Sequence, residues 1–214
     1  MTGQDGKGLF LRRILPCALF LCGVALLLFL EKAVAGEWGF PFDDSWIFAQ
    51  YARHLAEGQG FCFNRGEPSS GFTSFLWVLL CALGYKLTGA FGAPMKVMGV
   101  LFGVGSVIVT QRIIAALTND ATKARWCRHL TALFPPLIAN ALAGMEESPY
   151  VFTALLGVWM HLRWRGHRHP DGYGKGSGGA WAIWGNWGRY LLPAYLMVGW
   201  VLAVSLSSAR WLLF

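Results

Sequence analysis

Two adjacent carboxylates, Asp43 and Asp44, stand directly before a helical pattern that runs from Trp46 to Glu57. Apolar residues recur at every fourth position of that pattern, and the glycine that follows it favours a helix end. One aspartate can cap the helix while the other stabilises the helix dipole. Alternatively, a carboxylate at this place can act as a general base that removes the proton of a hydroxyl group.

Three further side chains of this helix, Tyr51, Arg53 and His54, are candidates for binding a substrate. Arg53 and His54 lie two to three turns after the carboxylates, where both can reach a phosphate group. The alternative is that both face solvent on an ordinary helix surface. The first reading predicts a site in which one helix supplies both a base and phosphate ligands.

A second acidic turn, Gly144-Met145-Glu146, follows an apolar segment that contains Pro135-Pro136. Proline inside a helix removes a backbone hydrogen bond and kinks the helix. We expect this kink to bring the turn, and Glu146 with it, toward a central cavity.

The residue pattern predicts no metal site built from protein ligands alone. The five cysteines show no C-x-x-C spacing, which excludes zinc sites of the paired-cysteine type. Two adjacent carboxylates and a substrate phosphate together suit Mg²⁺ or Mn²⁺, although two oxygens alone do not make a site. A divalent cation therefore stays a candidate cofactor.

The composition indicates a membrane protein. Hydrophobic residues make up 55% of the chain and charged residues only 14%, against roughly 25% charged residues in soluble domains. The apolar run from Ile14 to Leu30 has seventeen residues, which at about 1.5 Å each just cross a hydrocarbon core of about 30 Å. A cleaved signal peptide is the alternative, because Arg12-Arg13, this run and Ala33-Val34-Ala35 are similar to its three regions. Either way, the next segment lies outside the cytoplasm.

The net charge of +7 follows from topology and does not indicate a nucleic-acid partner. Most acidic residues, including Asp43, Asp44 and Glu146, fall in two segments assigned to the outside. Basic residues form three clusters between apolar segments, which the positive-inside rule assigns to the cytoplasm. These clusters are Lys7, Arg12 and Arg13, then Lys123, Arg125 and Arg128, then Arg163, Arg165, Arg168, Lys175 and Arg189.

The predicted fold is an all-α integral membrane protein with its N-terminus inside and about five transmembrane helices. The short run from Phe72 to Leu87 would export the Lys123 cluster if it spanned the membrane, so we expect a juxtamembrane or re-entrant helix on the outer side. The chain divides into a transmembrane region (1–170, outer loop 32–71), a Gly/Trp-rich linker (171–189) and a terminal transmembrane segment (190–214). The expected spans are Ile14 to Leu30, Val97 to Leu117, Leu130 to Ala143, Tyr150 to Leu162 and Tyr190 to Leu206.

The first outer loop and the start of the short apolar run after it contain a series of motifs, and the acidic turn lies about 100 residues after the first of them. The loop motifs are Phe42-Asp43-Asp44-Ser45-Trp46-Ile47-Phe48, Tyr51-Ala52-Arg53, Glu57-Gly58-Gln59-Gly60-Phe61 and Gly71-Phe72-Thr73-Ser74-Phe75-Leu76-Trp77. In this order, followed by Pro135-Pro136 and Gly144-Met145-Glu146, they resemble the opening of GT-C membrane glycosyltransferases. The branch that they resemble most is that of arabinofuranosyl- and mannosyltransferase-like proteins.

This resemblance implies transfer of a sugar from a polyprenyl phosphate to a glycan or lipid acceptor, on the outer side of the bacterial cytoplasmic membrane. It implies that Asp43 or Asp44 is the general base and that Glu146 is a supporting carboxylate on the same side. We expect Asp44, nearer the helix start, to be the cap, and Asp43 to project toward Glu146 as the base.

The resemblance covers about residues 38–164. Family members are usually at least twice as long as this chain, and the Gly/Trp-rich stretch stands where they carry an Arg-Pro-acid segment. The alternative function is a non-catalytic truncated relative, or an accessory membrane subunit, that binds a lipid-linked sugar. A partner membrane chain is a candidate for completing the site.

Overall fold

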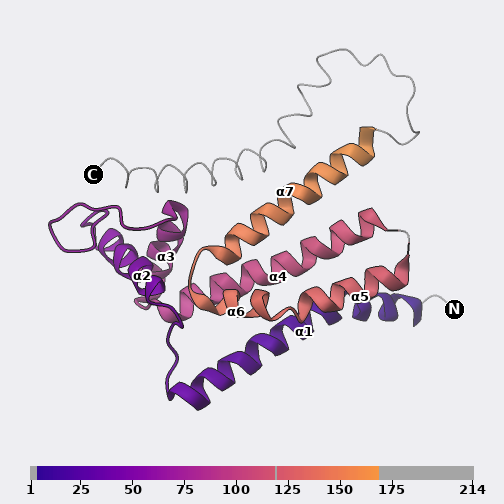
Figure 1. The fold of residues 1–214 in the computed structure, drawn as a ribbon, viewed down its shortest axis with the longest axis horizontal. Helices are drawn as coiled ribbons and strands as arrows, with labels where there is room; N and C mark the ends of the chain where they lie inside the picture. Colours follow the sequence, from indigo (N-terminus) through magenta and orange to yellow (C-terminus); the bar gives the residue numbers. More distant parts are fainter. Residues whose placement is uncertain (1–3, 119, 169–214) are drawn as a thin grey trace, which may run out of the picture.

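The computed structural model of the chain describes residues 4–118 and 120–168. The named elements in this part of the chain are all helices, and none is a strand (Figure 1), which confirms the all-α fold for the described residues. The linker at 171–189 and the span expected at Tyr190 to Leu206 lie outside them. The helices are α1 (Gln4–Ala35), α2 (Asp43–Ala56), α3 (Phe75–Thr88), α4 (Gly92–Leu117), α5 (Ala121–Ala132), α6 (Pro135–Ala143) and α7 (Glu147–Arg168).

Helix α4 is the centre of an elongated bundle, and α2 and α3 pack together at one end of it (Figure 1). Helices α1, α5, α6 and α7 all contact α4. A Cβ atom at Gly99 would lie 2.3 Å from the carbonyl oxygen of Ala141, and one at Gly103 would lie 2.5 Å from the ring of Phe20. These two glycines, one turn apart, let the α4 backbone approach α6 and α1 as in helix pairs built on small residues.

Two described helical segments, Ile14–Ala35 and Gly92–Leu117, are long and apolar enough to cross a membrane. Only 17% and 28% of their most apolar stretches are buried, whereas a core helix of a soluble protein is mostly buried. Helix α1 nevertheless belongs to the folded unit, because Phe20 and Val24 pack in a core cluster with residues of α4 and α6.

The prediction that Leu130 to Ala143 forms one kinked transmembrane helix is wrong. The structure divides it into α5, which ends at Ala132, and α6, which begins at Pro135. Proline needs no N–H partner in the first turn of a helix, and it disfavours helical backbone in the residue before it. The paired prolines therefore start a new helix, and α6, with 9 residues, is about 13 Å long and too short to span a membrane alone.

Helix α3 agrees with the expectation of a helix that does not span. It has 14 residues, about 21 Å of helix, and it packs mainly against α2. Its place on the outer side of a membrane stays a prediction. Helix α7 contains the span expected at Tyr150 to Leu162 and begins three residues earlier, at Glu147.

A methyl group at position 99 should force α4 away from α6. In Gly99→Ala the new Cβ meets the Ala141 oxygen at 2.3 Å, and overpacking of this kind costs about 1–3 kcal/mol. Gly92→Ala is the matched control in the same helix, because a Cβ there meets nothing within 4 Å. We expect a lower Tm in detergent for Gly99→Ala alone, and equal Tm values for both variants would contradict the close helix contact.

Candidate functional site

The two acidic segments found in the sequence lie together at one end of the bundle, where α6 ends and α7 begins. Gly144 ends α6 with a left-handed backbone, φ +76°. Its carbonyl oxygen accepts a hydrogen bond from Trp77 Nε1 at 3.1 Å, and the Ala143 carbonyl accepts one from Ser45 Oγ at 2.6 Å. Both bonds are buried, and they fix α2 and α3 against the turn.

Glu146 and Glu147 form an acidic pair at this turn. Thr73 Oγ1 donates a hydrogen bond to Glu146 Oε1, whereas the Oε2 atoms of both glutamates are buried and have no hydrogen-bond partner among the described residues. Burial is the largest cause that raises the pKa of the Glu147 carboxyl, and the charges of Glu146 and Asp44 raise it further, against a lowering by its own backbone N–H. Asp44 therefore belongs to the same electrostatic unit, which we call the acidic face: Asp44, Glu146 and Glu147.

The prediction that Asp44 caps α2 is wrong. The helix begins at Asp43, so the N-cap is Phe42, which has extended backbone and no side-chain cap bond. Both aspartates lie in the first turn, where a negative charge still stabilises the helix dipole. The Asp44 charge contributes to the raised pKa of Glu147, whereas Asp43 lines a groove along α2, so Asp44 is the aspartate that interacts with the acidic turn.

The groove along α2, called the α2 groove below, has a volume of about 450 Å³. Side chains from α2, from the loop after it and from the residue before α4 form its lining. They are Asp43, Trp46, Ile47, Ala49, Gln50, Arg53, Phe63 and Phe91. Of the three substrate-binding candidates on this helix, Arg53 alone lies in the lining.

Tyr51 serves the structure of the outer loop and does not line the groove. Its side chain is buried in the core between α2 and α3. The hydroxyl accepts a hydrogen bond from the Gly71 N–H at 2.8 Å and lies 2.9 Å from Ser69 Oγ. Because these contacts occupy the hydroxyl, we withdraw Tyr51 as a substrate ligand.

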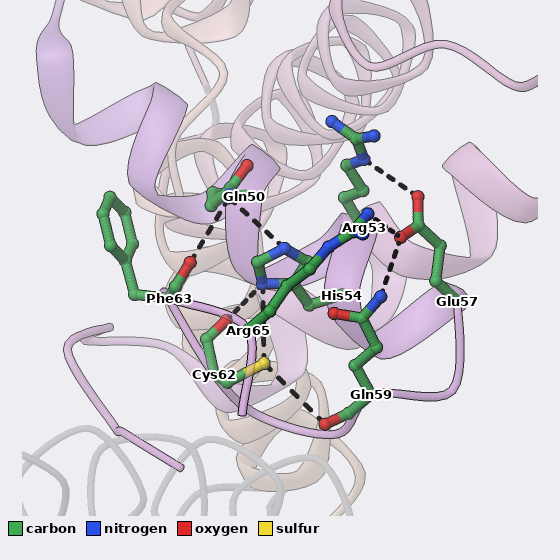
Figure 2. A network of polar contacts seen from close by, with 8 residues as sticks. All are labelled: Gln50, Arg53, His54, Glu57, Gln59, Cys62, Phe63 and Arg65. Atoms are coloured by element: carbon green, nitrogen blue, oxygen red, sulfur yellow. Dashed lines mark hydrogen bonds and ion pairs between the residues drawn. The ribbon is translucent and has the colours of Figure 1, made fainter. Parts of the chain in front are cut away.

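His54 is also buried, contrary to both readings of it as a phosphate ligand and as a solvated side chain. Its Nδ1 lies 2.8 Å from the Cys62 carbonyl oxygen and its Nε2 lies 3.3 Å from Gln50 Nε2 (Figure 2). The carbonyl can only accept, so Nδ1 is the donor in that contact, and the Gln50 amide donates to the other ring nitrogen. His54 thus fastens the loop that follows α2.

Arg53 is the exposed cation of this helix. Its Nε donates to Glu57 Oε1 at 2.8 Å, and Arg65 approaches the other oxygen of Glu57 at 3.4 Å (Figure 2). Among the described residues the two terminal nitrogens of Arg53 make no recorded bond. The guanidinium is therefore oriented by Glu57 and still has donors for a ligand.

A largely buried ion pair holds the segment that precedes α2. Lys96 Nζ lies 2.7 Å from both carboxylate oxygens of Glu31, and Glu31 also accepts a hydrogen bond from the Gly39 N–H at 2.9 Å. The Lys96 ammonium lies 5.8 Å from the ring centroid of Phe40. That ring in turn fills the space beside Gly144, where a Cβ would meet it at 2.3 Å.

Sequence reasoning missed several residues that build this site. Ser45, Thr73 and Trp77 stand inside the loop motifs, but the motifs do not say which backbone groups or side chains these residues contact. Glu31 and Lys96 were detectable as opposite charges at the ends of two apolar segments, which alternating topology places on one side. Glu147 was detectable as the neighbour of Glu146.

Removal of the Glu147 charge should stabilise the protein in a pH-dependent way. Because the folded-state pKa is raised, stability falls as pH rises from the ordinary carboxyl pKa through the raised value, and Glu147→Gln abolishes that fall. We expect the variant to have a higher Tm than the wild type at about pH 7 and a smaller difference at about pH 4. Glu37→Gln, at an exposed carboxylate, is the control, and a gain in Tm that is independent of pH would contradict the assignment.

Among the described residues, no group of three His, Cys, Asp or Glu side chains is arranged to hold a metal ion. No protein-family model, curated protein or solved structure matches the chain.

Proposed function

We propose that this protein is an integral membrane glycosyltransferase, which takes a sugar from a polyprenyl phosphate donor and transfers it to a glycan or lipid acceptor outside the cytoplasm. The observation that carries the proposal is the contact between the first outer loop and the Gly144-Met145-Glu146 turn. Ser45 and Trp77 bond to the last carbonyls of α6, and Thr73 bonds to Glu146. The two segments that resemble GT-C enzymes are thus the two segments that the fold joins.

The distribution of charge along the bundle supports this topology. The turn between α6 and α7 lies toward the end of the bundle where α4 begins, whereas the start of α5 and the end of α7 lie at the opposite end (Figure 1). The second basic cluster, at Lys123, Arg125 and Arg128, belongs to α5. The positive-inside rule assigns that end to the cytoplasm and the acidic face to the outer side.

In the proposed reaction Asp44 replaces Asp43 as the general base, because Asp44 belongs to the acidic face. The Asp44 carboxylate takes the proton of the acceptor hydroxyl while the hydroxyl oxygen attacks the anomeric carbon. The bond from that carbon to the phosphate oxygen breaks, polyprenyl phosphate leaves with the electron pair, and the configuration inverts. Glu146, oriented by Thr73, is the supporting carboxylate that helps to position the acceptor.

Substitution of Asp44 tests the reaction most sharply. We expect Asp44→Asn to lower sugar transfer from a labelled polyprenyl phosphate sugar by about 10²–10⁴-fold, with unchanged amounts of protein in the membrane. Glu37→Gln changes an exposed carboxylate in the same outer loop and should transfer at the wild-type rate. Wild-type activity in Asp44→Asn would contradict the role of Asp44 as the base.

A non-catalytic relative that binds a lipid-linked sugar is the second candidate. The acidic face combines three carboxyl groups, which repel a phosphate, and the phosphate ligand proposed from the sequence, Arg53, lines the α2 groove and pairs with Glu57. Wild-type membranes that bind the donor but transfer no sugar to any acceptor would favour this second function.

A further inference from the structure

The α2 groove has aromatic walls that other aromatic rings hold in place from behind. Contacts between rings restrict the motion of the wall side chains before a ligand binds, which lowers the entropy cost of ordering them. The walls are Trp46, Phe63 and Phe91, and their supporting contacts are Phe40–Trp46 at 5.2 Å, Tyr51–Phe63 at 5.9 Å and Tyr85–Phe91 at 4.3 Å between ring centroids.

Polar groups are spaced along the same groove. Asp43 and Arg53 are ten residues apart in α2, about 15 Å along the helix. Gln50 lies between them, and its Nε2 donates to the Phe63 carbonyl at 3.3 Å and lies 3.3 Å from His54 Nε2 (Figure 2). With the amide nitrogen engaged, the amide oxygen of Gln50 is a fixed acceptor beside the aromatic walls.

This combination fits a sugar ring better than an apolar chain. A sugar presents C–H groups on its faces, which pack on aromatic rings, and hydroxyl groups on its edge, which bond to carboxylate, amide and guanidinium groups. An acyl chain would desolvate Asp43 and Arg53 without replacing their hydrogen bonds with water. The volume of about 450 Å³ lies within the range of small-molecule sites.

We propose that the α2 groove is a binding site for an uncharged sugar unit of the acceptor glycan, with Trp46 and Phe63 against the ring faces and Asp43 accepting hydrogen bonds from the sugar hydroxyl groups. Asp43, which lines the groove, and Asp44 of the acidic face are adjacent in the first turn of α2. A glycan in the groove can therefore present its next hydroxyl to Asp44. The assignment of this sugar to an acceptor glycan rests on the proposed function, whereas the binding of a sugar in the groove does not.

The test is saturation-transfer NMR on the full chain in detergent, with methyl mannoside, methyl arabinofuranoside and their disaccharides as probes. We expect saturable binding by the wild type, weakened about tenfold in Trp46→Ala and Phe63→Ala and partly kept in Trp46→Phe. Trp38→Ala is the control, because Trp38 is exposed and lies outside the groove lining. Absence of saturable binding to every probe, or equal binding by the wild type and Trp46→Ala, would overturn the proposal.

The same variants separate this inference from the proposed function. Asp44→Asn should bind the probes like the wild type while transfer is lost. Binding through Trp46 by a wild type that transfers no sugar would uphold the groove and refute the enzyme. Transfer that survives Trp46→Ala and Phe63→Ala with an unchanged KM for the acceptor would uphold the enzyme and refute the groove.

Discussion

The arrangement at the end of the bundle where α6 meets α7 depends on two carbonyl groups that α6 cannot satisfy itself. The last carbonyls of any helix lack an intrahelical partner, and a buried one without a hydrogen bond costs about 1–3 kcal/mol. In α6 these are the carbonyls of Ala143 and Gly144, and the Ser45 hydroxyl and the Trp77 indole satisfy them. One donor comes from α2 and the other from α3, so the end of a nine-residue helix fixes both against the bundle.

The acidic face follows from this docking. The Asp44 charge acts on Glu147 across this contact, and burial of the Glu147 carboxyl is the largest cause of its raised pKa. The Glu31–Lys96 pair and the Phe40 ring close the remaining side of the turn. Repulsion between the carboxylates destabilises the fold at this place, and the hydrogen bonds and the ion pair around the turn offset it. Such local destabilisation is common where a site serves function more than stability.

Helices with a strong local signal could be predicted from the sequence. Features that depend on contacts between distant residues could not. Apolar runs located α1, α4 and α7, and the glycine after the first-loop pattern correctly marked the end of α2. The period of that pattern placed Tyr51 on an apolar face, but it could not reveal that residues 57–69 fold back over α2 and bury His54. Pro135-Pro136 signals the break between α5 and α6. The apolar run continues through these prolines, however, and so favours one kinked helix over two helices. The partners of Ser45 and Trp77 lie 98 and 67 residues away, beyond what local propensity can indicate.

The contact between the first outer loop and the Gly144-Met145-Glu146 turn is most directly tested by cross-linking in membranes. In a chain freed of its five cysteines, Thr73→Cys and Glu146→Cys replace two side chains that touch. A short bifunctional thiosulfonate should join positions 73 and 146 within one chain, as read by mass spectrometry of the linked peptides. It should not join position 73 to a cysteine at Arg125, in the helix at the other end of the bundle. Failure to link 73 with 146, when each cysteine reacts singly with the reagent, would contradict the account.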